Sequence, residues 1–137
     1  DVEYVVGHCL LVRTKTMIDI GLMRPDFFIY WEELEWQWRA KLKGWKSLVK
    51  SGVLVYHDRF SYDKPRNIYL RVRNEIFFNR MVLDEGSNYK IFISNLIFVV
   101  KNGILGFFYQ RNLLNLKAYF KGIKDGLFMR IPEIEYL

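Results

Sequence analysis

The chain alternates between short apolar runs and polar segments that contain glycine or proline. The first run, residues 4–13, is rich in β-branched and apolar residues, which predicts a buried strand. Two more short strands are predicted at residues 46–50 and 53–57. Ser51-Gly52 separates them, and such a pair between apolar runs marks a turn. The pattern therefore predicts two or three strands in the first part of the chain.

Two helices are predicted between these strands. Thr14 is expected to cap a short helix through residue 20, and Gly21 to end it. A loop with Pro25 and Asp26 follows over residues 22–30. The second helix, residues 31–43, begins with acidic residues and ends with basic ones, which is the favourable sign for the helix dipole. Its apolar spacing predicts this buried stripe: Trp31, Leu34, Trp38 and Leu42. An ion pair between Glu35 and Arg39 is expected on the same helix.

The second part of the chain is predicted to be helical. Pro65 starts a helix over about residues 66–82, with Ile68, Val72 and Ile76 along one face. After a turn at residues 84–88, the apolar stretch 91–100 is shorter than the roughly 20 residues that cross a bilayer. The boundary is drawn between residues 1–64 and 65–137.

Aromatic and basic residues mix in the stretch 103–109 and in a predicted helix at 112–124. A helix pair packed on the domain explains this mixture, and so does a helix lying in the plane of a membrane surface. Both interpretations stay open.

Composition narrows the classes of partner. The 137 residues suffice for one core, and the net charge of +6 suits anionic partners. The basic residues are scattered along the chain, which argues against nucleic acid. The single cysteine, Cys9, excludes an internal disulfide and is expected to be a buried thiol, compatible with a reducing compartment. The chain opens directly on a predicted strand and shows no signal peptide, so we expect it to be part of a longer protein.

The candidate chemistry lies in Trp31-Glu32-Glu33 at a helix N-terminus and in His57 at a strand end. Acidic residues in a first helical turn commonly compensate the dipole, and a histidine at a strand end is commonly a hydrogen-bonded surface residue. These residues alone leave a structural and a catalytic interpretation open.

The order of the motifs favours the catalytic interpretation. Residues 4–57 hold an apolar strand, a helix ended by glycine, and then these motifs in order: Phe27-Phe28-Ile29-Tyr30, the double acid, Arg39-Ala40, Gly44-Trp45 and Val55-Tyr56-His57. This order resembles the C-terminal half of family 2 glycosyltransferases of the GT-A fold. The segments 69–74 and 121–127 are similar to helices of the bacterial rhamnosyl- and galactofuranosyl-transferase-like members. The resemblance implies an α/β fold, represented here by a few strands and helices with a helical C-terminal appendage.

The resemblance also implies roles for individual residues. Glu33 would be the general base of an inverting transfer, and Glu32 would hold the acceptor. Trp31 would offer an apolar face to a sugar ring, and Arg73 would reach the donor diphosphate, although a structural role on an exposed helix is equally open for Arg73. His57 would be a ligand of a divalent metal, Mn²⁺ or Mg²⁺, that stabilises the diphosphate. Most family members have Asp where this chain has Glu33, which displaces the carboxylate by about 1.5 Å.

The donor-binding half of the family pattern, with its Asp-x-Asp motif, is missing from these residues. The chain is therefore expected to be inactive alone. In the whole enzyme the substrates would be a nucleoside-diphosphate sugar and a glycan or lipid-linked acceptor for cell-surface polysaccharide. Its location would be cytoplasmic, at the inner face of the cell membrane. A homodimer and a peripheral membrane contact stay open. The alternative function is a non-catalytic membrane-peripheral interaction module.

Overall fold

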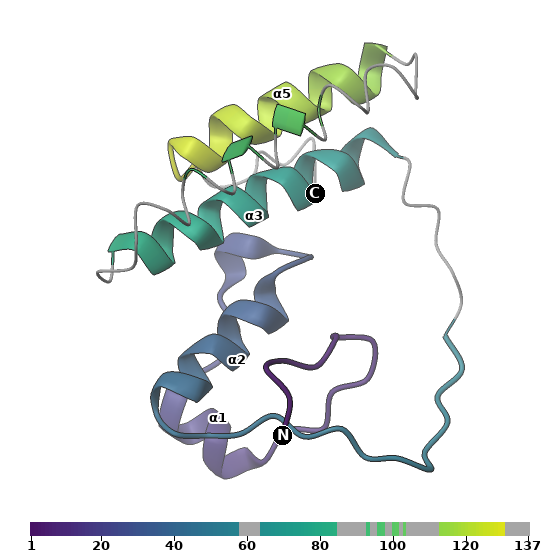
Figure 1. The fold of residues 1–137 in the computed structure, drawn as a ribbon, viewed down its shortest axis with the longest axis vertical. Coiled ribbons are helices and arrows are strands. Elements are labelled where there is room, and N and C mark those ends of the chain that lie inside the picture. The colour runs from purple at the N-terminus through teal and green to yellow at the C-terminus, as the bar shows by residue number, and fades with distance from the viewer. Residues whose placement is uncertain are drawn as a thin grey trace. The chain divides into compact units, whose positions relative to one another are not determined.

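The computed structural model describes residues 1–57, 64–84, 93, 96–97, 100–101, 103 and 113–130. The chain divides into two compact units, Asp1–Phe60 and Ser61–Leu137, which are treated separately below. The elements in chain order are helix α1, the short 3-10 helix η1, and helices α2, α3 and α5 (Figure 1).

The helices of the first unit are α1 (Thr14–Ile20), η1 (Pro25–Phe27) and α2 (Glu32–Leu42). The prediction of α1 and of its end is confirmed, since Gly21 adopts φ 81° and its N–H donates to the Met17 carbonyl. Thr14 is the first helical residue and not the cap. The cap position belongs to Arg13, which makes no side-chain capping bond. Helix α2 confirms the helix predicted over residues 31–43.

The predicted strands at residues 4–13, 46–50 and 53–57 do not form within the described residues. An antiparallel bridge joins Val2 to Ser47, where the Val2 N–H donates to the Ser47 carbonyl over 3.0 Å. A strand needs a neighbour to take up its backbone hydrogen bonds, and these segments have no ladder with one another. The predicted α/β fold would require such segments to pair in a sheet. The α/β fold class therefore stays a prediction.

The side chain of Gln37 supplies part of the missing pairing. Its amide oxygen accepts from the Val5 N–H over 2.7 Å, and its amide nitrogen donates to the Val5 carbonyl over 2.8 Å. Ser47 Oγ also donates to the amide oxygen, at 3.1 Å. One side chain of α2 therefore holds the N-terminal segment, in the way that a neighbouring backbone would in a sheet.

The predicted buried stripe of α2 is wrong. Leu42 is 63% exposed, while the buried residues of the helix are Glu35, Trp36, Gln37 and Ala40. Trp36 and Ala40 pack with Ile20 in a small core, and the Trp36 indole N–H donates to the Gly21 carbonyl over 2.8 Å. This side of α2 is buried because its polar side chains find hydrogen-bond partners, which offset the cost of removing them from water.

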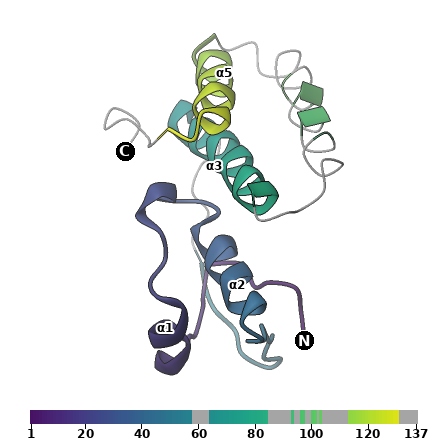
Figure 2. The ribbon, with the colours of Figure 1, turned by 90° about the vertical axis from the view of Figure 1, so that its left-hand side faces the viewer.

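The second unit is a pair of helices, α3 (Pro65–Asp84) and α5 (Leu113–Leu127), that lie side by side (Figures 1 and 2). They confirm the helices predicted over residues 66–82 and 112–124. Small residues four apart allow their close approach: Ala118 is 2% exposed, and the next two positions in the row are Gly122 and Gly126. A Cβ atom at Gly126 would lie only 2.7 Å from the Arg73 carbonyl oxygen.

Polar side chains fill the interface of the helix pair. The Tyr69 hydroxyl donates to Asp125 Oδ2 over 2.9 Å, and Lys121 Nζ lies 3.3 Å from the same oxygen. Arg73 is fully buried, and its guanidinium donates to the Arg130 carbonyl at 3.0 Å and to Asn74 Oδ1 at 2.7 Å. The exposed position considered for Arg73 is therefore wrong, because the guanidinium is buried and bonded to the segment that follows α5.

Several predictions fall largely outside the described residues. The turn at residues 84–88, the helix at 91–100 and the aromatic stretch 103–109 are among them, although the described residues 93, 96–97, 100–101 and 103 are helical. Among the helices that can be described, we find none with the length and apolar character needed to cross a membrane.

Candidate functional site

The loop that leads into α2 has an unusual backbone. Phe28, Tyr30 and Trp31 have φ values of 63°, 71° and 74°, in the left-handed region that residues with a side chain rarely adopt. Each such residue costs on the order of 1–3 kcal/mol and persists only where the surroundings enforce it. Phe27, which is completely buried, anchors the loop. Strained backbone occurs preferentially at functional sites, so the residues that follow this loop are candidates for a functional site.

Those residues are Glu32 and Glu33, in the first turn of α2. Trp31 occupies the cap position without a side-chain capping bond. Glu33 Oε1 accepts weakly from the Gly7 N–H, at 3.4 Å, and a Cβ atom at Gly7 would lie 3.0 Å from Glu33 Cγ. The absence of a side chain at Gly7 therefore lets the N-terminal segment lie against Glu33.

Each of the two carboxylates has one oxygen that is buried and unpaired. In the part of the chain that the structure describes, Glu32 Oε2 and Glu33 Oε2 have no hydrogen-bond partner. Burial without a partner costs free energy, because the lost water is not replaced. Each of these two oxygens keeps the capacity to accept a hydrogen bond.

Burial also raises the pKa of the Glu32 carboxyl, and the charge of the neighbouring Glu33 adds to this effect, while the backbone N–H of Glu32 opposes it. The folded protein therefore holds Glu32 in an environment that disfavours its charged form. Such a shift is common at catalytic and binding sites, where groups are arranged for a ligand and not for stability.

We expect Glu32→Gln to stabilise the first unit by about 1 kcal/mol at pH 7.5, because the amide carries no charge to desolvate. The folded pKa of Glu32 lies above its unfolded value, so the penalty is present in full above the folded pKa. It fades as the pH falls through that value. The gain should therefore shrink towards pH 4. Urea unfolding at both pH values measures it.

Glu3→Gln is the matched control, because the Glu3 side chain is 85% exposed and pairs with Lys41, at 3.6 Å. It removes the same charge and is expected to change the free energy of unfolding by less than about 0.5 kcal/mol. A destabilised Glu32→Gln variant would show that the Glu32 carboxylate is well solvated or paired.

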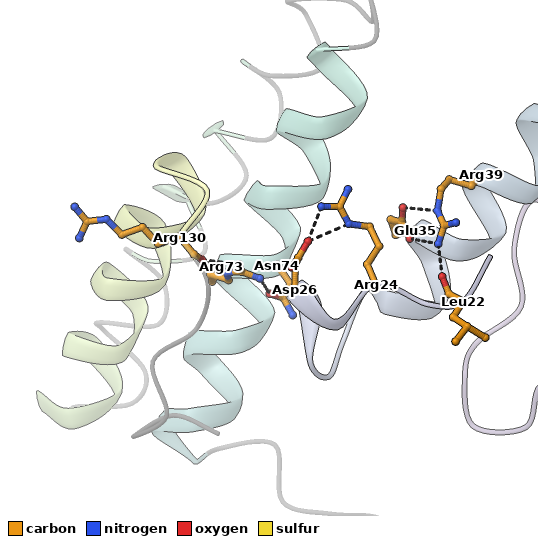
Figure 3. A network of polar contacts seen from close by, with 8 residues as sticks. All are labelled: Leu22, Arg24, Asp26, Glu35, Arg39, Arg73, Asn74 and Arg130. Carbon is orange, nitrogen blue, oxygen red and sulfur yellow. Dashed lines mark hydrogen bonds and ion pairs between the residues drawn. The ribbon is translucent and has the colours of Figure 1, made fainter. Parts of the chain in front are cut away.

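Glu35, in the same turn of α2, has a different role (Figure 3). It is completely buried and accepts two hydrogen bonds from the Arg39 guanidinium, at 2.7 and 3.0 Å. Arg39 also donates to the carbonyl oxygens of Ile20 and of Leu22, the latter over 2.9 Å. The predicted ion pair is confirmed, and it ties α2 to the segment that follows α1.

His57, the expected metal ligand, is exposed and lies against His8, with 4.3 Å between the two ring centroids. The described residues contain no group of three His, Cys, Asp or Glu side chains that could hold a metal ion. Mg²⁺ and Mn²⁺ prefer several oxygen ligands, so a pair of imidazoles does not match the diphosphate-bound ion that the resemblance implies. Cys9 is exposed, which corrects the expectation of a buried thiol.

The structure thus brings Trp31, Glu32 and Glu33 together beside Gly7, and it places Arg73 in the second unit, among the contacts of the helix pair. Sequence reasoning missed His8 because a lone histidine in an apolar run carries no pattern. It also missed the role of Gly7. The only signal for that role in the sequence was a small residue directly before His8. No family model matches this chain, and neither a curated protein nor a solved structure shows significant similarity to it.

Proposed function

We propose that this chain carries the acceptor-binding side of an inverting glycosyltransferase, which moves a sugar from a nucleoside-diphosphate donor to an acceptor hydroxyl in cell-surface glycan synthesis. The observation that carries the proposal is the pair of buried oxygens of Glu32 and Glu33, next to the strained loop, for which the described residues supply no hydrogen-bond partner. The motif order along residues 4–57 supports the same reaction class.

The roles follow from the chemistry of a single displacement. The attacking hydroxyl must lose its proton as it reaches the anomeric carbon, and a carboxylate within hydrogen-bond reach can accept that proton. Glu33 takes this role. Glu32 accepts a hydrogen bond from a second hydroxyl and so fixes the orientation of the acceptor ring. Trp31, half-buried at the cap position, offers its ring face to the sugar.

The donor side of the reaction would be supplied by residues beyond this chain. A divalent ion, when bound there, would neutralise the leaving diphosphate. His57 is the residue of this chain that the resemblance assigns to that ion. The described residues do not complete a site for it, so the proposal for this chain is confined to the acceptor.

A second candidate function is a non-catalytic module on a membrane surface. The observation that favours it is the outward face of α5, where large apolar residues alternate with lysines. Leu113 and Phe120 are 72% and 61% exposed and lie on one side of α5 with Lys117 and Lys124, and Phe128, which is 66% exposed, follows directly after the helix. Such a helix can lie in the interface of an anionic bilayer.

The acceptor proposal predicts that the chain binds saccharides in the absence of nucleotide. Saturation-transfer NMR with methyl glycosides of rhamnose and galactose, and with short oligosaccharides, should give a signal. Glu33→Gln should weaken the affinity about tenfold or more, because a hydrogen bond to a charged acceptor is worth roughly 1.5–3 kcal/mol. Glu3→Gln should leave the affinity unchanged, because the Glu3 side chain is 85% exposed and pairs with Lys41, which is not part of the proposed site.

Calorimetry with a nucleoside diphosphate and Mn²⁺ is the complementary experiment, and no tight binding is expected. A micromolar dissociation constant would contradict the assignment of this chain to the acceptor side. Equal saccharide binding by the wild type and Glu33→Gln would contradict the role of Glu33. No saccharide binding, combined with sedimentation on anionic but not on neutral vesicles, would favour the membrane module.

A further inference from the structure

The only two histidines of the chain meet in the first unit. The rings of His8 and His57 lie 4.3 Å apart between centroids and stand at 85° to each other, edge to face. Both residues are exposed. Two segments that are distant in sequence therefore present their imidazoles at one place on the surface.

We propose that His8 and His57 form a two-imidazole site for a borderline divalent ion, with Zn²⁺ as the ion that fits it. Zinc binds imidazole nitrogen at about 2.0–2.1 Å, so two nitrogens on one tetrahedral ion lie roughly 3.3 Å apart. Rings with centroids 4.3 Å apart reach that separation by side-chain rotation alone, and exposed side chains can rotate without disturbing a core.

The backbone around His8 supports this geometry. The Val5 N–H and carbonyl are held by the Gln37 amide, and the Gly7 N–H by Glu33. His8 therefore extends from a segment that is attached to α2 on its N-terminal side. A ligand on a held segment loses less conformational freedom when it binds a metal ion than a ligand on a free chain.

The chemistry of the donors decides the class of ion. Imidazole suits Zn²⁺, Ni²⁺ and Cu²⁺, whereas Mg²⁺ requires oxygen ligands. No third His, Cys, Asp or Glu completes a group with the pair within the described ranges, so water would fill the other positions of the ion. The bound ion would join the N-terminal segment to residues 53–57, which form no strand in this structure. The site rests on these two rings and is independent of the proposed transferase function.

Calorimetric titration of the untagged chain with Zn²⁺ at pH 7.5 tests the proposal. One ion per chain is expected. His8→Gln and His57→Gln should each weaken the affinity at least about tenfold, because the second imidazole of a chelating pair binds intramolecularly. Cys9→Ser is the control and should bind like the wild type, because Cys9 is also exposed and directly follows His8.

The number of Zn²⁺ ions bound per chain distinguishes one shared site from two separate histidine sites. Two weak sites, of which each histidine variant removes one, would overturn the proposal, and so would a loss of binding in Cys9→Ser. Electron paramagnetic resonance of the Cu²⁺-loaded wild type provides a second measurement that needs no variant. Two coordinated imidazole nitrogens are expected, and a single one would overturn the site.

Discussion

Replacing Glu35 with glutamine is expected to destabilise the first unit by about 2–4 kcal/mol, one of the two largest effects that the structure predicts. Glu35 is completely buried and accepts two hydrogen bonds from the Arg39 guanidinium, at 2.7 and 3.0 Å. The amide keeps the size of the side chain but removes the charge and one acceptor. The Arg39 guanidinium, only 25% exposed, would then lose its counter-charge. The midpoint of urea unfolding measures the change.

The substitution Glu32→Gln is the matched comparison, since it makes the same chemical change in the same helical turn and is expected to change stability with the opposite sign. A double-mutant cycle between Glu35→Gln and Arg39→Gln should give a coupling energy of about 1–3 kcal/mol. Additive effects in that cycle, or a stability of Glu35→Gln within about 0.5 kcal/mol of the wild type, would contradict the anchoring role of the pair.

Gly126→Ala is expected to disrupt the packing of α3 against α5. In an isolated helix this change is favourable by about 1 kcal/mol, because alanine has the higher helix propensity. Here the added Cβ would lie 2.7 Å from the Arg73 carbonyl oxygen and 2.8 Å from Ile76 Cβ, so the helices must move apart. Overpacking of this kind costs roughly 1–3 kcal/mol. We expect net destabilisation, measured by thermal unfolding followed by circular dichroism.

Lys124→Ala serves as the control for this experiment, because Lys124 lies on the exposed side of the same helix. It is expected to change the free energy of unfolding by less than about 0.5 kcal/mol. Gly122→Ala should behave like Gly126→Ala, since its Cβ would lie 2.8 Å from the Tyr69 carbonyl oxygen. A Gly126→Ala variant more stable than the wild type would show that the helices pack less closely than described.

The helices could be predicted because their signals are local. Gly21 ends α1, the acidic first turn starts α2, and Pro65 starts α3, and each of these effects acts within one turn of the helix. The close pairing of α5 also had a signal that sequence reasoning left unused. Ala118, Gly122 and Gly126 are spaced four apart, which places them in one row of the helix surface.

The buried face of α2, the backbone of the loop before it and the candidate site could not be predicted, because they depend on contacts that the local sequence does not show. Apolar periodicity assigned Trp31 and Leu42 to the core, but the hydrogen bonds of Glu35 and Gln37 selected the opposite face of α2. The Val5 partner of Gln37 is 32 residues away in the sequence, so a periodicity rule cannot find it, whereas the pair of Glu35 and Arg39 is local and was predicted. Nothing about Tyr30 indicates a left-handed backbone either, because aromatic residues rarely adopt one. The two unpaired carboxylate oxygens became visible only with the surroundings of α2 in place.

The two hydrogen bonds between the Gln37 side chain and the Val5 backbone affect the dynamics of the N-terminal segment. In a sheet, a backbone amide exchanges its hydrogen with water only when part of the ladder opens. Here the Val5 amide is covered by one side chain, through a bond of 2.7 Å. Its exchange rate is therefore governed by the rotamer of Gln37, so one side-chain rotation on α2 exposes the Val5 amide to water while the contacts of Val2 with Ser47 and of Gly7 with Glu33 remain.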